Sequence, residues 1–472
     1  MTTWPDDTRH GSAVDGEMAP DERRELVRRI AEQVGRLVSI QVEDAVESGR
    51  PMTDDAEKVA AAAEIQRLLG AHNELRLRDG RRALSGPLHQ ALFDAVMAHA
   101  YGLAGLDELW NDPEVENIVA NGPDDVFVTF AGGRSRRWSP IAGSEGEMIE
   151  LIRRAARRLG LVEVDFDTSH PMLDLQLPDG SRLYAVYGGR DVNGISTRPQ
   201  LSLRRHRHQD LTVADTVALG LWPTRAAEFV KAAFAAGSNV IVAGDWNAGK
   251  TTLLRALCLD AIPRHHRVVT AEAGLTELGL HRCRDRLENV ADLFSKPASA
   301  DGGGAVSVWE LIKGPSRRLT PTRVIVGEIL GDEVAAVLDV FCGSTKGSAC
   351  TLHARSALGV VTRLEQLGAM ADPPLSSTGV RAALAEARPI VVHLTAQEDA
   401  DGATTRFCTS IVTVVGLEDG EVAMTELWGL DRDDVLVPRN PLPHALRTSL
   451  RRWGWDWDVE GWADAIVDGA RP

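Results

Sequence analysis

The chain has 472 residues, of which 44% are hydrophobic and 25% are charged, as in ordinary folded proteins, which argues against wholesale disorder and fibrous repeats. Its 52 Lys and Arg against 68 Asp and Glu leave a formal net charge of -16, which argues against broad electrostatic binding to nucleic acid or anionic lipid. The length predicts two or three domains.

Targeting and redox signals are absent from the sequence. No run reaches the roughly 18 apolar residues of a spanning helix, and residues 1–10 carry acids without an apolar stretch, so we expect a cytoplasmic protein. The cysteines are odd in number and include no C-x-x-C pair, which favours reduced structural thiols over disulfides or a zinc site. They are Cys258, Cys283, Cys342, Cys350 and Cys408.

The residue pattern changes twice in the first half of the chain. Residues 1–20 lack periodicity and predict a mobile lead-in, whereas apolar residues recur at helical spacing over 21–109 and predict a helical prefix. Short alternating segments such as Val126–Phe130 and Leu173–Leu177, each followed by a turn signal, then predict a small α/β domain over 110–205.

In the second half, strand and helix patterns alternate from residue 206 to about 430 at the spacing of a parallel sheet covered by helices. The predicted fold class is therefore α/β, with a helical N-terminal prefix, a small α/β N-terminal domain and a larger α/β C-terminal domain. The Trp-rich tail, residues 431–472, carries no functional signature.

The strongest motif is Gly244–Thr252, which satisfies the G-x-x-x-x-G-K-[ST] pattern of a phosphate-binding loop (P-loop). The apolar run Val240–Ala243 precedes it and a helical pattern follows it, so the loop joins a buried strand to a helix N-terminus, where anions are favoured. We expect Lys250 to contact the β- and γ-phosphates and Thr251 to give its hydroxyl to Mg²⁺. The predicted nucleotide-binding residues are Gly244, Asp245, Trp246, Asn247, Ala248, Gly249, Lys250, Thr251 and Thr252.

Two glutamates end apolar strand-like runs. Glu328 follows Val324–Gly327, and Glu272 follows Val268–Ala271. Because open α/β sheets hold ligands at the carboxyl edge, we predict that both carboxylates lie near the Mg²⁺ bound by Thr251 and polarise the attacking water. Either glutamate alone is equally well explained as a solvated acid at a strand end, and only proximity to the loop favours a catalytic role.

A histidine, His353, ends another short strand in Gly347–Ala354. A lone histidine is more often a structural residue than a catalytic one, so the residue pattern by itself leaves its role open.

Taken in order, these motifs resemble the secretion ATPases of the type II and type IV secretion superfamily, most closely the CpaF-like branch that serves Tad (Flp) pili. The resemblance covers roughly residues 86–430. The matching blocks are Asn111–Ile118 with Asn121–Pro123, Leu177–Arg182, the P-loop, Val324–Glu328 with Gly331, Thr351–Ala354, and Arg363–Glu365.

The resemblance implies a RecA-like P-loop ATPase domain over 206–430, joined to the smaller domain in a homo-hexameric ring that binds ATP and Mg²⁺ between the two. It implies that Lys250 and Thr251 form the Walker A pair and that Glu328 is the Walker B glutamate. Glu272 would be the acid of the "Asp box" and His353 the "His box". Arg182, Arg204 and Arg205 match arginines that family members present to the nucleotide, a role suited to a planar, permanently charged guanidinium.

The chain also departs from the family pattern. Asp245, Trp246 and Asn247 replace small residues of G-G-T-G-S-G-K-T-T, and Ala273 replaces the aspartate of the "Asp box". The stretch Gly343–Ser348 lacks the histidine of T-G-H-D-G-S, and Arg286–Val290 lacks the arginine that normally follows the L-E-T step. We expect nucleotide binding to survive and hydrolysis to be slow, because groups that orient water and transition-state charge are replaced.

The leading hypothesis is a cytoplasmic ATP-hydrolysing motor, held at the inner face of the membrane by a platform protein, that drives pilus assembly or protein export. The alternative is a nucleotide-binding ring scaffold that hydrolyses weakly or not at all. A nucleic-acid translocase on the same core is disfavoured by the acidic balance and by aromatic residues at only 5%, so no nucleic-acid partner is expected.

Overall fold

The structure is a computed structural model that describes residues 18–47, 54–101, 106, 109–110, 112–158, 166–177, 180–189, 194–205, 211–274, 277–296, 298, 303–345, 347–400 and 402–455. The predicted lead-in up to residue 17 and the tail from residue 456 lie outside the described residues. Within the described residues, those up to 131 and 135–205 form one compact unit, and 132–134 with those from 211 onward form a second.

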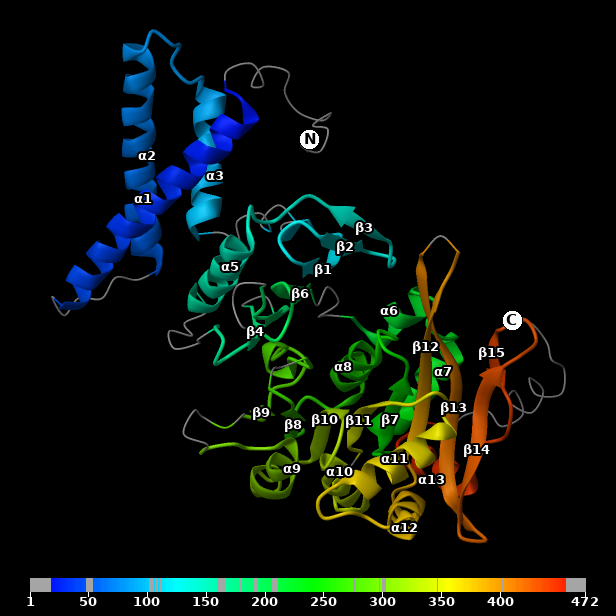
Figure 1. The fold of residues 1–472 in the computed structure, drawn as a ribbon. Coiled ribbons are helices and arrows are strands. Elements are labelled where there is room, and N and C mark those ends of the chain that lie inside the picture. Colours follow the sequence, from blue (N-terminus) through cyan, green and yellow to red (C-terminus); the bar gives the residue numbers. More distant parts are fainter. Residues whose placement is uncertain are drawn as a thin grey trace. The chain divides into compact units, whose positions relative to one another are not determined.

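The first unit begins with the predicted helical prefix. Its helices are α1 (Pro20–Glu47), α2 (Asp54–Arg78) and α3 (Gly86–Tyr101) (Figure 1). They pack through a core of their own, to which each helix contributes buried residues such as Val34, Ile65 and Leu92. Because residues three and four apart lie on one helix face, the apolar spacing read from the sequence becomes this core.

The rest of the first unit is a six-stranded antiparallel sheet with the order β3-β2-β1-β6-β5-β4. Helix α5 (Glu145–Arg158) buries Met148 and Ile152 in the same core as Ile118 and Leu203 of the sheet. The predicted strand Val126–Phe130 is β2. The strands are β1 (Val115–Asn121), β2 (Val126–Phe130), β3 (Ser135–Trp138), β4 (Met172–Gln176), β5 (Arg182–Val186) and β6 (Gln200–Arg204).

The second unit is built on a nine-stranded sheet with the order β15-β14-β13-β12-β7-β11-β10-β8-β9. The strands from β12 to β9 in this order are parallel, and β13, β14 and β15 extend the sheet by antiparallel pairing. The strands are β7 (Val240–Gly244), β8 (Val268–Glu272), β9 (Val290–Phe294), β10 (Arg323–Ile329), β11 (Ala349–His353), β12 (Ile390–Glu398), β13 (Thr404–Glu418), β14 (Glu421–Leu430) and β15 (Leu436–Pro438).

Helices cover both faces of this sheet, so its central strands are apolar on both sides (Figure 1). In β7, Val240 and Val242 belong to the core that includes α7 and α8, whereas Ile241 and Ala243 belong to the core that includes α10, α11 and α12. The helices are α6 (Val213–Ala218), α7 (Thr224–Ala235), α8 (Lys250–Ala261), α9 (Val308–Leu311), α10 (Glu333–Cys342), α11 (Gly359–Met370), α12 (Ser377–Ala387) and α13 (His444–Arg452), with short turns Leu280–Arg282 and Ile312–Ser316.

This architecture confirms the predicted α/β fold with a RecA-like core. The loop-bearing strand β7 lies between β12 and β11, and β11 separates it from β10. The carboxyl ends of β7, β11, β10 and β8 therefore meet at one edge, which brings together loops that are far apart in the sequence. Among the described residues, no helix is long and apolar enough to cross a membrane.

Candidate nucleotide site

Strand β7 and helix α8 hold the P-loop between them. All five residues of β7 are buried, and α8 begins at Lys250 directly after Gly249, whose φ of 86° lies in the left-handed region that favours glycine. Gly244 is required for a different reason, because a Cβ there would lie 2.1 Å from the backbone oxygen of Leu394. The backbone path of the loop is thus fixed by glycines at both ends.

Helix α8 presents its N-terminus to the loop without a side-chain cap, since Gly249 has no side chain. The first N–H groups of a helix lack intrahelical partners, and the helix dipole adds positive charge at that end. An anion such as a phosphate satisfies both, so this end of α8 suits a triphosphate.

Lys250, His353 and Glu328 form a continuous chain of polar contacts. The Lys250 Nζ atom lies 2.7 Å from the Asp245 backbone oxygen and 3.1 Å from His353 Nδ1. The same Nζ atom lies 3.3 Å from His353 Nε2, and Nε2 lies 2.7 Å from Glu328 Oε1. Burial, with the neighbouring Lys250 charge, lowers the pKa of His353, so the ring is neutral at pH 7.

Glu272 is deeply buried, with 2% of its surface exposed. Its Oε2 atom accepts from the backbone N–H groups of Glu277 at 2.7 Å and Leu278 at 2.9 Å. Burial raises the pKa of Glu272 to about 7, and the two N–H donors oppose that rise. This carboxyl group is therefore placed to fasten the loop that follows β8.

The acid that reaches Thr251 is Glu277, which the sequence motifs did not single out. Thr251 Oγ1 lies 3.4 Å from Glu277 Oε2, a long hydrogen bond between the first turn of α8 and the loop after β8. The sequence patterns point to acids at strand ends, whereas Glu277 lies five residues beyond the end of β8 in irregular backbone. Glu277 could have been predicted only from its position in a loop that leaves the carboxyl edge of the sheet, where such sheets bind ligands.

A buried arginine on α8 supports the same loop. Arg255 is 6% exposed, and its guanidinium donates to the backbone oxygen of Leu278 and lies 3.0 Å from Cys283 Sγ. The backbone N–H of Leu278 thus donates to Glu272, and its backbone oxygen accepts from Arg255. Glu277 is thus attached to a loop that is fixed to β8 and to α8.

The unusual loop residues contact neighbouring strands. Asp245 Oδ2 accepts from Thr395 Oγ1 of β12 at 2.6 Å, and the Asn247 backbone oxygen accepts from Arg406 Nε of β13 at 2.8 Å. Trp246 lies against the ring of His353, with the ring centroids 4.4 Å apart. The predicted residues Ala248 and Thr252 complete the loop and the first turn of α8, Ala248 being buried and Thr252 half-buried.

The three predicted arginines belong to the first unit, where each has local contacts. Arg182 of β5 pairs with Asp174 of β4, its Nε 2.9 Å from Oδ1, and it lies opposite Arg204 in the register of β5 and β6. Arg205 donates to the Asp112 backbone oxygen at 2.6 Å and lies over the ring of Trp110. A role of these arginines toward a nucleotide stays a prediction.

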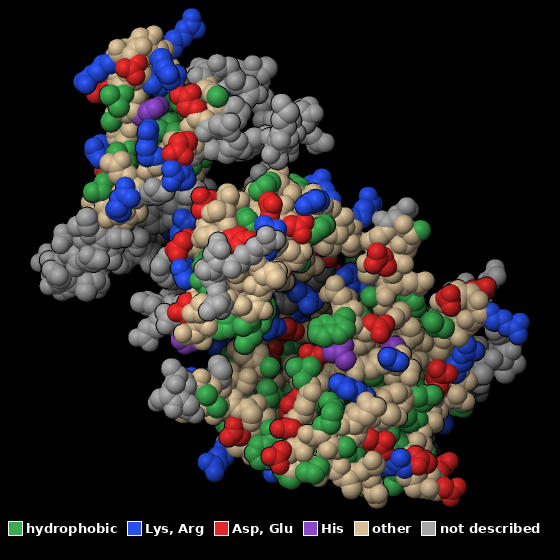
Figure 2. Space-filling model, viewed as in Figure 1, with side chains coloured by type: hydrophobic (Ala, Val, Ile, Leu, Met, Phe, Trp, Pro, Cys, Tyr) green, Lys and Arg blue, Asp and Glu red, His purple; other side chains and the backbone are tan. Residues whose placement is uncertain are grey.

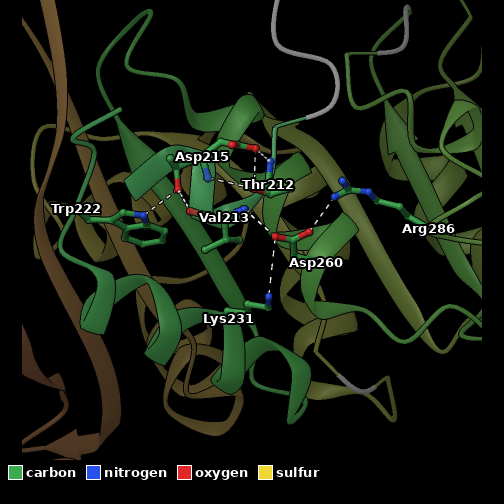
Figure 3. Close-up of polar contacts among 8 residues, drawn as sticks. Thr212, Val213, Asp215, Trp222, Lys231, Asp260 and Arg286 are labelled. Carbon is green, nitrogen blue, oxygen red and sulfur yellow. Dashed lines mark hydrogen bonds and ion pairs between the residues drawn. The ribbon is translucent and has the colours of Figure 1, made fainter. Parts of the chain in front are cut away.

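The far end of α8 is tied to the start of the second unit (Figure 3). Asp260 accepts from the backbone N–H of Val213 at 2.8 Å and from Arg286 at 2.9 Å, and Lys231 lies 4.0 Å away. Thr212 and Asp215 cap α6 reciprocally, so α6 starts at a fixed point next to α8.

The donor set fits ATP and Mg²⁺. Thr251, Glu277 and Glu328 offer the hydroxyl and carboxylate oxygens that Mg²⁺ prefers, and this ion is commonly held by one or two carboxylates together with substrate phosphates. Lys250 and the N-terminus of α8 supply positive charge for the phosphates.

The chain is similar to several known proteins. A family model described as "Type II/IV secretion system protein" matches residues 100–409. A Mycobacterium tuberculosis H37Rv protein whose name refers to conjugal transfer is 29% identical over 338 residues, which cover 70% of this chain and 89% of that protein. VirB11 of Agrobacterium fabrum C58 is 27% identical over 268 residues, covering 52% and 74%. The crystal structure of the VirB11 ATPase from the Brucella suis type IV secretion system superposes with a TM-score of 0.33 and 22% sequence identity. The match covers 66% of this chain and 95% of the VirB11 chain.

Proposed function

The chain belongs to the type II/IV secretion system protein family, and from that premise we propose that it is an ATP-hydrolysing motor of a pilus or secretion system. The observation that carries the proposal is the contact chain from Lys250 through His353 to Glu328, beside the pair Thr251 and Glu277. These side chains come from α8, β11, β10 and the loop after β8, and they converge on one phosphate-binding loop.

In this mechanism the protein positions the phosphates and the water. Lys250 leaves the Asp245 oxygen and His353 to bind the β- and γ-phosphates, and the backbone N–H groups at the start of α8 bind the remaining oxygens. Glu328, oriented by His353 Nε2, positions the attacking water. Thr251 and Glu277 would hold Mg²⁺, which when bound would neutralise phosphate charge, and Glu272 keeps Glu277 in place.

Several finer features belong to the same proposal. We propose that Arg182, Arg204 and Arg205 approach the nucleotide from the first unit and that the chains assemble as a homo-hexameric ring. We place the ring in the cytoplasm, bound to an inner-membrane platform protein, and in the CpaF-like branch that serves Tad pili. The family membership and the matching sequence blocks support these features.

The decisive experiment measures ATP binding and phosphate release by Lys250→Ala. We expect loss of both by at least about 100-fold, since the ammonium contributes charge to the ground state and the transition state. Lys231→Ala is the matched control, because this lysine lies on α7 and is 45% exposed. Phosphate release by Lys250→Ala at the wild-type rate would refute the proposal.

A second function, a nucleotide-binding scaffold without turnover, is favoured by one observation. The loop carries an additional acid, Asp245, beside the phosphate position, and its backbone oxygen already holds Lys250. Glu328→Gln separates the two functions. The motor requires a large fall in phosphate release with ATP binding retained, whereas an equal near-zero rate in wild type and variant supports the scaffold.

A further inference from the structure

The most exposed large apolar side chain of the P-loop is Trp246, with 77% of its surface exposed. It belongs to no hydrophobic core of the second unit, and its indole lies against the imidazole of His353, with ring planes inclined by 30°. Figure 2 shows histidine side chains beside hydrophobic ones on the surface of this unit. An indole kept at the surface against one imidazole suggests a role in the orientation of that ring.

His353 needs a defined orientation because its two nitrogens contact groups of opposite charge. Lys250 Nζ lies 3.1 Å from Nδ1 and 3.3 Å from Nε2, and Glu328 Oε1 lies 2.7 Å from Nε2. An aromatic ring packed against the imidazole restricts its tilt, so the indole adds a constraint on the orientation of His353.

The indole is itself held, because the residues on either side are fixed to neighbouring strands. The carboxylate of Asp245 accepts from Thr395, and the backbone oxygen of Asn247 accepts from Arg406. Asn247 adopts a φ of 61°, which asparagine tolerates better than most residues. The Trp246 backbone therefore lies between two anchored neighbours.

We propose that Trp246 is a positioning residue that fixes the imidazole of His353 between Lys250 and Glu328. This inference rests on the proposed function, and it explains why a large aromatic residue occupies a loop that usually carries small ones. Because Trp246 belongs to the loop that wraps the phosphates, the indole also links the loop backbone to the orientation of Glu328.

The test compares Trp246→Ala and Trp246→Phe with wild type in the full-length chain. Trp246→Ala should lower kcat about three- to tenfold, the range expected from loss of one aromatic stack, with KM for ATP changed less than about twofold. Trp246→Phe keeps a stacking ring and should retain at least about half of kcat. Met370→Ala, which removes an apolar side chain that is 69% exposed on α11, should behave as wild type.

A spectroscopic measurement without nucleotide checks the stack directly. The emission of Trp246, taken as the difference between wild type and Trp246→Phe, should change when His353 is replaced by glutamine, since the indole then loses the imidazole that it contacts. An unchanged difference would show that the indole does not contact the imidazole and would overturn the inference. Because Trp246 is exposed, its variants should keep the wild-type melting temperature, which separates the effect on kcat from misfolding.

The outcomes are distinct. Wild-type kcat in Trp246→Ala, or equal defects in the Ala and Phe variants, overturns the inference and leaves the motor assignment intact. A raised KM with unchanged kcat also overturns it, because the indole would then bind the nucleotide itself. A wild-type chain that releases no phosphate overturns the proposed function and the inference together.

Discussion

Replacing Glu272 by glutamine should stabilise the protein at alkaline pH far more than at acidic pH. Burial is the main cause that raises the pKa of Glu272 from 4.5 to about 7, and the nearby charges of Glu277 and Asp292 add to it. The N–H donors of Leu278 and Glu277 reduce the rise without cancelling it. The ionised carboxylate is therefore less favourable in the folded protein than in the unfolded chain.

The sign of the pH dependence follows from proton binding. Below pH 4.5 both states hold the proton, so Glu272 makes no difference to the free energy of unfolding. Between pH 4.5 and about 7 only the folded state holds it, so stability falls as the pH rises. Above that range the loss is complete, and the gap between 4.5 and about 7 corresponds to about 3 kcal/mol.

Glutamine removes the charge and keeps an oxygen that accepts from Glu277 and Leu278. Urea unfolding at pH 5 and pH 8.5, in chelator and without nucleotide, gives the stability of both proteins. The advantage of Glu272→Gln should grow by about 2.5 kcal/mol between these pH values. Glu418→Gln, at an exposed acid, should show no such growth. A constant difference, or a less stable Glu272→Gln at pH 8.5, would refute the reasoning.

Three further substitutions test the loop and its support. Gly244→Ala should lower the free energy of unfolding by about 2 kcal/mol or more, because the new methyl group would lie 2.1 Å from the Leu394 oxygen; an unchanged melting curve contradicts this. Asp245→Asn should tighten ATP binding about threefold by removing one negative charge from an exposed position, and calorimetric titration showing equal or weaker binding rejects the argument. Arg255→Met should raise the Mg²⁺ concentration needed for half-maximal turnover severalfold, since the loop that carries Glu277 loses a support; an unaltered Mg²⁺ dependence is the opposing result.

Sequence reasoning succeeded where regular structure determines position. The apolar run of β7, the P-loop and the helical pattern of α8 predicted a buried strand, a loop and a helix, and these elements are present. Since parallel strands end at one edge, the meeting of His353 and Glu328 with Lys250 also follows from strand-end positions. The catalytic roles of these residues remain predictions for the kinetic experiments.

Side-chain contacts that involve loops could not be predicted from the sequence. Glu277 lies in a loop without periodicity, and only the folded chain shows that its carboxylate reaches Thr251. The sequence pattern predicts only that Arg255 lies in helix α8. It does not predict that the guanidinium donates to the loop after β8. Trp246 departs from the expected loop composition, and its contact with His353 depends on the ring orientations of two separate elements.

Helix α8 connects the P-loop to the first residue of α6, Val213. Its 12 residues span about 18 Å, with Lys250 at the first position and Asp260 near the last. An α-helix is stiff along its axis, so the Val213 amide that Asp260 binds is held at a fixed distance from the P-loop. The start of α6 and the phosphate-binding loop are therefore joined by one helix, without an intervening loop.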